Sequence, residues 1–273
     1  MTAISANAGA DRLGGVWNVA KPQIRNVVRS RWLVCYLAFF LIATEGLLRF
    51  NGGDPKTLLS LGNVVLFIVP LVTLVYGTVY LYNSREFIEL LLAQPLKRGT
   101  LFTGLYLGLV IPLAASLVGG VTIPFIYHGV ADGQPLALVT LLTGAAALTA
   151  AFTGIAFCVA LRFEDRLTGL GVGLAIWLLL ALVYDGVMLF VIAASDSTME
   201  TALLAASLAN PIDLVRIALL LQFDVAALMG YTGAVFNRFF SAATGGVVIA
   251  MALAAWIAIP LAGGFVAFNR RDF

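Results

Sequence analysis

Six long apolar runs dominate this sequence. A helix needs roughly 17–25 mostly apolar residues to cross about 30 Å of hydrocarbon, and each run is about that long. The runs are continuously apolar and rich in Gly and Ala, whereas strands of a membrane barrel alternate every second residue. We therefore predict an all-α polytopic membrane protein with six transmembrane helices. The predicted spans are about Trp32–Leu48, Leu61–Tyr82, Leu101–Ile126, Leu136–Leu161, Leu167–Ala194 and Ala242–Phe268.

The composition agrees with the bilayer as solvent. Of the 273 residues, 61% are hydrophobic and 11% are charged, and the mean hydropathy is +1.01. A soluble domain has about 25% charged residues, so the chain cannot present an ordinary wetted surface. The formal net charge of +2 offers no basic surface for nucleic acid. These values exclude a cytosolic enzyme, a disordered chain and a nucleic-acid-binding protein. Cys35 and Cys158 lie in apolar runs and predict no disulfide framework.

The positions of the cationic residues predict the orientation. With the N-terminus inside, the outer connections hold only four of the 16 Lys and Arg residues. Cytoplasmic connections of membrane proteins retain Lys and Arg. We therefore expect both termini in the cytoplasm and the chain in the inner (cytoplasmic) membrane. The predicted cytoplasmic cations are Arg12, Lys21, Arg25, Arg29, Arg31, Arg85, Lys97, Arg98, Arg162, Arg166, Arg270 and Arg271.

The segments outside the spans complete the predicted organisation. Residues 1–15 are small and polar and are expected to be a disordered tail. Residues 32–268 form a single transmembrane domain, and 269–273 form a cytoplasmic tail. Residues 195–241 are interpreted as a helical insertion on the outer face. Within it, Asn210-Pro211 predicts a helix start, because proline fits the first helical turn.

The run Leu214–Phe223 is too short for a seventh span. It has ten residues, and Asp213, Arg216 and Asp224 bracket or interrupt it. A seventh crossing would also place the C-terminal cations outside, against the charge bias.

Residues 16–31 carry an amphipathic pattern, VWNVAKPQIRNVVRSR. Trp17, Ala20 and Ile24 fall on one helical face, and Lys21 and Arg25 lie on another. This pattern is typical of a helix lying in the headgroup plane, with its cations toward anionic lipid. The alternative, a cationic flank that only orients the first span, explains the charges but not the apolar stripe.

The loop between the second and third spans contains a second amphipathic piece, NSREFIELLLAQPLKRGT. Ser84 can cap a short helix over about 84–95, with Glu86 near its positive end and Pro95 at its end. A short helix with charged and apolar faces suits docking of a soluble partner. A tight turn closed by a salt bridge is the alternative, and the pattern alone does not decide between them.

Two acidic residues, Glu45 and Asp185, lie within predicted spans, in the outer half of the bilayer. Ionisable groups at this depth are costly and often mark a function, so both are candidates for a translocation path or for a contact across a dimer. For Glu45 an ion pair with Arg49, one helical turn later, is the favoured interpretation. Asp185 has no partner at helical spacing.

The quoted segments resemble a known family. The N-terminal stretch, the loop SREFIELLLAQPLKRGTLF, the span-five stretch IWLLLALVYDGVML, the segment LANPIDLVRI and the closing RRDF are similar to those of permease subunits of type-two ABC exporters. Within that family they most resemble permeases of the system that matures the copper site of nitrous oxide reductase. The loop departs from the acidic-Gly-Thr-Leu pattern common in the family.

The resemblance implies a type-two ABC exporter permease fold in a homodimer. It implies that a separate ABC ATPase subunit binds ATP and Mg²⁺, that the 84–95 helix is the coupling helix, and that a periplasmic accessory protein meets the outer segment. The implied ATPase-coupling residues are Ser84, Arg85, Glu86, Phe87, Glu89, Leu90 and Pro95. The implied accessory-protein contacts are Asn210, Pro211, Asp213 and Arg216. The chain itself has no G-x-x-x-x-G-K-[ST] phosphate loop, so we expect neither enzymatic activity nor a cofactor in this subunit.

Three other functions stay open at this point. One is an ion-coupled secondary transporter that uses Glu45 and Asp185. Another is an ABC exporter of lipid-like or drug-like cargo, and the third is a membrane anchor without transport. Direct copper binding has no support, because the single His and the two Cys are not clustered.

Overall fold

The computed structural model describes residues 3–51, 55–93, 97–128, 135–194, 207–223 and 242–271. Within these residues, six helical segments are long and apolar enough to cross a membrane, which confirms the six predicted spans. The segments are Arg31–Phe50, Thr57–Asn83, Arg98–His128, Pro135–Arg162, Arg166–Phe190 and Gly245–Arg270. They lie in α2 (Arg31–Asn51), α3 (Pro55–Asn83), α5 (Arg98–His128), α6 (Pro135–Arg162), the fifth span and α12 (Ala242–Arg270).

The fifth span is not a uniform α-helix. It consists of α7 (Arg166–Leu178), a π-helical turn η1 (Leu179–Val183) and α8 (Tyr184–Ala194). Asp165 caps α7, because its Oδ2 accepts from the Thr168 backbone nitrogen at 2.8 Å. A π-helical turn inserts one extra residue into a turn and is often found at functional sites. Here it directly precedes Tyr184 and Asp185.

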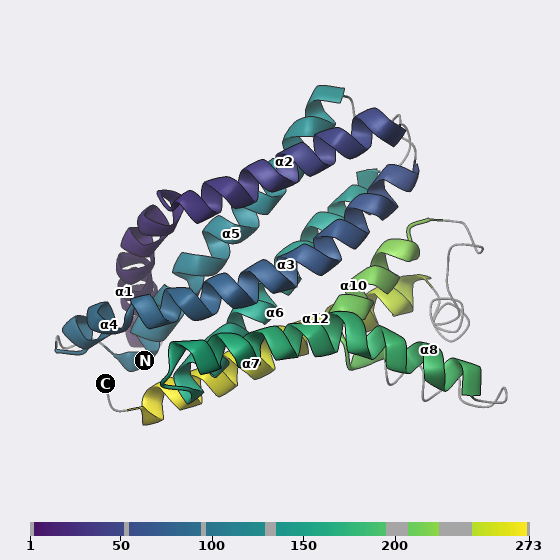
Figure 1. Ribbon diagram of the computed structural model, residues 1–273. Helices are drawn as coiled ribbons and strands as arrows, with labels where there is room; N and C mark the ends of the chain where they lie inside the picture. Colours follow the sequence, from purple (N-terminus) through teal and green to yellow (C-terminus); the bar gives the residue numbers. More distant parts are fainter. Residues whose placement is uncertain are drawn as a thin grey trace.

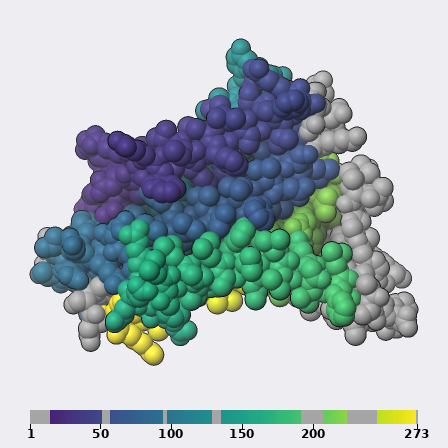
Figure 2. All heavy atoms as spheres, viewed as in Figure 1, coloured from purple at the N-terminus to yellow at the C-terminus, as the bar shows by residue number. Residues whose placement is uncertain are grey.

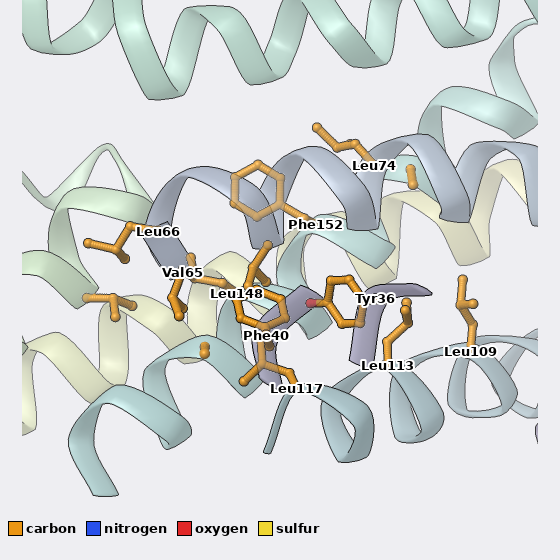
Figure 3. Packing of buried hydrophobic residues seen from close by; sticks show 14 of the residues in the cluster. Tyr36, Phe40, Val65, Leu66, Leu74, Leu109, Leu113, Leu117, Leu148 and Phe152 are labelled. Atoms are coloured by element: carbon orange, nitrogen blue, oxygen red, sulfur yellow. The ribbon is translucent and has the colours of Figure 1, made fainter. Parts of the chain in front are cut away.

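Helix α6 occupies the centre of the bundle. In its spanning window 72% of the residues are buried, against 17% in the fifth span and 22% in α12. Side chains from α2, α3, α5 and α6 meet in one apolar core, which includes Phe40, Val65, Leu113 and Phe152 (Figure 3). The fifth span packs mainly on α3 and forms a ridge along one face of the molecule (Figure 2). Within the part of the chain that the structure describes, its outward side is apolar and exposed.

The N-terminal helix α1 (Ala3–Val28) packs against α5 and is longer than the predicted segment 16–31. It begins at Ala3 and so covers most of the residues 1–15 that the sequence predicted to be a disordered tail. Close packing is possible because α5 presents glycines at spacing four. A Cβ at Gly104 would lie 2.7 Å from Val19 Cβ, and one at Gly108 would lie 2.6 Å from Gln23 Cβ.

The buried side of α1 differs from the apolar stripe expected for a helix on the lipid surface. Val19, Ala20, Gln23 and Val27 are buried, and Gln23 Oε1 accepts from the Tyr80 hydroxyl at 3.0 Å. Trp17 is 53% exposed. Part of the predicted apolar stripe therefore packs against the bundle, whereas Trp17 is exposed and can contact lipid.

Two short helices mark the opposite ends of the bundle. Helix α4 (Arg85–Leu92) follows α3, and both chain termini lie at the same end as α4 (Figure 1). We call this the α4 end. Helix α10 (Pro211–Leu220) lies at the opposite end, which we call the α10 end, and packs among α3, α6 and α12. It has ten residues and does not span, as predicted.

The rest of the predicted insertion 195–241 lies outside the described residues, apart from 207–223. What is described is not an exposed appendage. Leu214 and Ile217 of α10 pack with Ile249 of α12 in a small second core, and Gly144 of α6 leaves no room for a side chain against Val215. Helix α10 is therefore an integral part of the α10 end.

Candidate functional site

Helix α4 presents a narrow exposed face. Glu86, Glu89, Leu90 and Ala93 are exposed, and their spacing of three and four places them on one side of the helix. Leu90 is 71% exposed. A face that combines two carboxylates with a bare leucine can dock on a soluble partner through charge and apolar contact together. We call these four residues the α4 face.

The opposite side of α4 anchors it to the bundle. Ile88 is completely buried, and Phe87 is half-buried against the core. The sequence interpretation missed Ile88 as the anchor. Its position was readable, since it lies at spacing three and four from Arg85 and Leu92, on the side away from the carboxylates.

Two predicted coupling residues face the protein and not the solvent. The prediction that the Ser84 side chain caps α4 is wrong: Ser84 holds the N-cap position, but its hydroxyl donates to the Tyr80 carbonyl at 2.8 Å. Arg85 stacks on the Tyr82 ring, with its Cζ 4.5 Å from the ring centroid, and donates toward the turn between α6 and α7. Pro95 lies outside the described residues.

At the α10 end, Asn210 and Pro211 start α10 as predicted. Asn210 Oδ1 accepts from the Ile212 backbone nitrogen at 3.0 Å, and Pro211 occupies the first turn. Asn210 Nδ2 also donates to the carbonyl of Leu180 at 2.8 Å. Leu180 belongs to the π-helical turn, so one buried amide caps α10 and holds the irregular backbone of the fifth span. No sequence signal indicated that turn.

A charged cluster joins the same two elements. Arg216 Nη2 of α10 lies 3.0 Å from Asp185 Oδ2 of α8, and Arg216 Nη1 lies 3.3 Å from Asp213 Oδ1. The structure therefore brings together Asp185 with all four residues that the resemblance assigned to an accessory protein. Asp185, which lacks a partner in its own helix, finds its cation on another element. We call Asp185, Asn210, Asp213 and Arg216 the α10 cluster.

The cluster is partly buried, and this shifts the acidity of Asp213. Burial raises its pKa to about 6, although the charge of Arg216 acts in the opposite direction. Asn210, Pro211 and Asp213 are buried in the protein. Their predicted contact with an accessory protein stays a prediction, and it would require α10 to move outward.

Glu45 makes a separate set of polar contacts that joins the first and third spans. Its Oε1 lies 2.7 Å from Arg49 Nε, which confirms the predicted ion pair. Its Oε2 lies 2.9 Å from His128 Nε2, at the end of α5. The contact with His128 was not predicted, because nothing in one sequence links residues so distant along the chain. Both carboxylate oxygens of Glu45 are therefore engaged.

Among the side chains that the structure describes, no group of three or more His, Cys, Asp or Glu residues could hold a metal ion.

Comparisons with known proteins show the family of the chain. Residues 64–273 match the profile of the ABC-2 family transporter protein. A relative from Stutzerimonas stutzeri, described as a probable ABC transporter permease protein NosY, is 26% identical, and the match covers 94% of this chain and 98% of the relative. A protein of the same description from Pseudomonas aeruginosa is 28% identical with the same coverage. The chain therefore belongs to the ABC-2 family of transporter proteins, as a multi-pass membrane permease similar to NosY over nearly its whole length.

Proposed function

We propose that this permease subunit receives ATP-driven motion from a separate ATPase subunit through α4 and delivers it to the α10 end. ATP and Mg²⁺ are bound by the ATPase, and the permease contributes the docking surface and the moving spans. The observation that carries the proposal is the α4 face, with Glu86, Glu89 and Leu90 exposed on a short helix whose other side is fixed by Ile88.

The proposal places the α4 end in the cytoplasm, where ATP is available. The distribution of Lys and Arg supports this orientation. The common position of α4 and both termini at one end of the bundle agrees with it (Figure 1). The α10 end then faces the periplasm from the inner membrane.

We propose a homodimer that pairs with two ATPase subunits. Support comes from the lightly buried outer spans: α2, the fifth span and α12 have 28%, 17% and 22% of their spanning windows buried. A polytopic protein must cover such apolar faces with lipid or with a second copy. Two permeases are also the number implied by the resemblance to type-two exporters.

We further propose that the α10 end serves a periplasmic accessory protein in copper-enzyme maturation, the process of nitrous oxide reductase assembly. The support is the similarity to NosY permeases and the presence of a helical insertion at this end. Because the described residues show no candidate metal cluster, the permease is proposed to act mechanically or on a cargo that is not bound copper.

The composition of the complex can be tested by native mass spectrometry after gentle solubilisation. We expect two copies of this chain, two ATPase subunits and the accessory protein in one assembly. A chain recovered alone, with proton-driven flux after reconstitution and no ATP requirement, would overturn the proposal in favour of an ion-coupled carrier.

The role of α4 can be tested by reversing its charges. Glu86→Lys and Glu89→Lys should weaken co-purification of the ATPase, and the double variant should weaken it most. Arg166→Glu is the control for charge reversal, because Arg166 is an exposed charged residue at the same end but lies outside α4. Equal ATPase recovery from the double variant and the wild type would contradict the assignment of α4 as the coupling helix.

A further inference from the structure

Arginines on both sides of α4 bind backbone carbonyls at the ends of other spans. Arg85, the first residue of α4, donates from Nη2 to the carbonyl of Glu164 at 3.0 Å and to that of Phe163 at 3.4 Å. Its guanidinium stacks on Tyr82, whose hydroxyl donates to the same Phe163 carbonyl at 2.8 Å. Arg85 is therefore fixed against the turn that ends α6.

Arg98 holds a different span. It begins α5, directly after the loop that follows α4, and its Nη1 donates to the carbonyls of Asn269 and Arg271, each at 3.0 Å. These carbonyls belong to the C-terminal end of α12. Arg85 thus connects α4 to the end of α6, and Arg98 connects the start of α5 to the end of α12.

Arg271 links those two spans to each other. Its Nη1 donates to the carbonyls of Leu161 at 2.8 Å and Ala160 at 3.1 Å, in the last turn of α6. Partial burial, and then the positive charge of Arg85, lower the pKa of Arg271, so the cations are crowded at this place. The neighbouring carbonyls that the two guanidinium groups bind at the end of α6 offset the repulsion.

The geometry suits transmission of force. The last carbonyls of a helix lack partners within the helix and carry partial negative charge. Each of these arginines donates from one terminal nitrogen to two carbonyls, so two points on the neighbouring helix end are fixed together. Because the acceptors are backbone atoms, a displaced arginine pulls the helix end itself. α4 cannot move away from the end of α6, and the start of α5 cannot move away from the end of α12, unless these bonds break.

We infer that Arg85 and Arg98 are positioning residues. Arg85 transmits a displacement of α4 to the fourth span, and Arg98 transmits the accompanying displacement of the start of α5, which contacts α4, to the sixth span. This inference rests on the proposed role of α4 as the coupling helix. It goes further, because it assigns the binding of the ATPase and the transmission of its motion to different residues. The α4 face binds the ATPase, and the two arginines, which point into the protein, carry the motion onward. Helix α6, the most buried span, then passes it to the core.

The test uses the complete complex with the ATPase that co-purifies with the wild-type chain. Spin labels are placed at Phe50 in α2 and Leu136 in α6, both exposed at the α10 end, after Cys35 and Cys158 are replaced by serine. The distance between the labels is measured with and without ATP and Mg²⁺. In Arg85→Gln/Arg98→Gln we expect ATPase recovery equal to that of the wild type but loss of the ATP-dependent distance change.

Arg166→Gln is the matched control, since Arg166 is an exposed arginine at the same end, and it should keep the distance change. Arg85→Lys retains the positive charge but not the guanidinium, and it should give an intermediate distance change. This result would show that the loss in the glutamine variants is not a general folding defect.

The inference is overturned if the double variant keeps the full distance change. If Glu86→Lys/Glu89→Lys also keeps the ATPase bound, the coupling role of α4 fails, and the inference fails with it. If the arginine variants keep the distance change while Glu86→Lys/Glu89→Lys loses the ATPase, α4 remains the coupling helix and only the transmission role of the arginines is refuted.

Discussion

Arg216 of α10 lies 3.0 Å from Asp185 of α8, so the one intramembrane acid without a partner in its own helix is neutralised by a helix that does not cross the membrane. The pair fixes α10 to the fifth span directly after its π-helical turn. Asp213 approaches the same guanidinium from within α10. A single cation therefore serves two carboxylates in a partly buried site.

We predict that Arg216→Gln destabilises the protein by about 1–3 kcal/mol, between the values for exposed and buried ion pairs. The substitution leaves Asp185 and Asp213 close together without a cation. Thermal unfolding in detergent should show a lowered midpoint. Asp185→Asn/Arg216→Gln should recover part of the loss, because it removes one of the stranded carboxylates. A midpoint for Arg216→Gln equal to that of the wild type would show that the pair contributes nothing.

A second prediction concerns pH. The pKa of Asp213 is raised from its ordinary value of 3.8 to about 6, so the folded protein binds this proton more tightly than the unfolded chain does. Its contribution to stability is present below about pH 4 and is lost as the pH rises to about 6, by up to about 3 kcal/mol. Asp213→Asn should remove this component. We would compare the unfolding midpoints of the two proteins between pH 4 and 7; a constant difference across that range would contradict the assignment.

The sequence predicted the spans well because a helix that crosses a membrane must be long and apolar, and such runs are readable without tertiary information. It also predicted the start of α10, since Asn210 and Pro211 act through local backbone geometry. The Glu45–Arg49 pair was readable for the same reason, because its partners are one helical turn apart.

Partners far apart along the chain could not be read in this way. The pairs of Asp185 with Arg216 and Glu45 with His128 depend on how the spans pack. The residue types of the π-helical turn do not predict it. Arg85 illustrates the limit most clearly, because the sequence predicts it among the residues that dock the ATPase, while the fold turns its guanidinium toward the turn that ends α6. An amphipathic pattern indicates exposed and buried faces, but a long cation can belong to either.

A third prediction separates the two bonds of Asn210. Asn210→Ala removes both the cap of α10 and the donor to Leu180, and we expect a loss of about 1–3 kcal/mol. Asn210→Ser can restore the cap but does not reach Leu180, so it should recover only part of this loss. Hydrogen exchange should become faster at 179–183 in both variants and in α10 only for the alanine variant. Exchange unchanged at 179–183 would exclude a role for Asn210 in holding the π-helical turn.

The last prediction contrasts the two sides of α4. Ile88 is completely buried and Leu90 is 71% exposed, although both are apolar and belong to the same short helix. Ile88→Ala should destabilise α4 by about 2–5 kcal/mol, the usual cost of this truncation in a core, and hydrogen exchange should show faster opening of 85–92. Leu90→Ala should leave exchange unchanged, because its side chain contributes little to folding.

Both variants should reduce recovery of the ATPase. Ile88→Ala loosens the helix that presents the α4 face, and Leu90→Ala removes the apolar part of that face. Recovery unaffected by Leu90→Ala would mean that the carboxylates alone make the contact, whereas recovery unaffected by Ile88→Ala would show that the partner binds elsewhere.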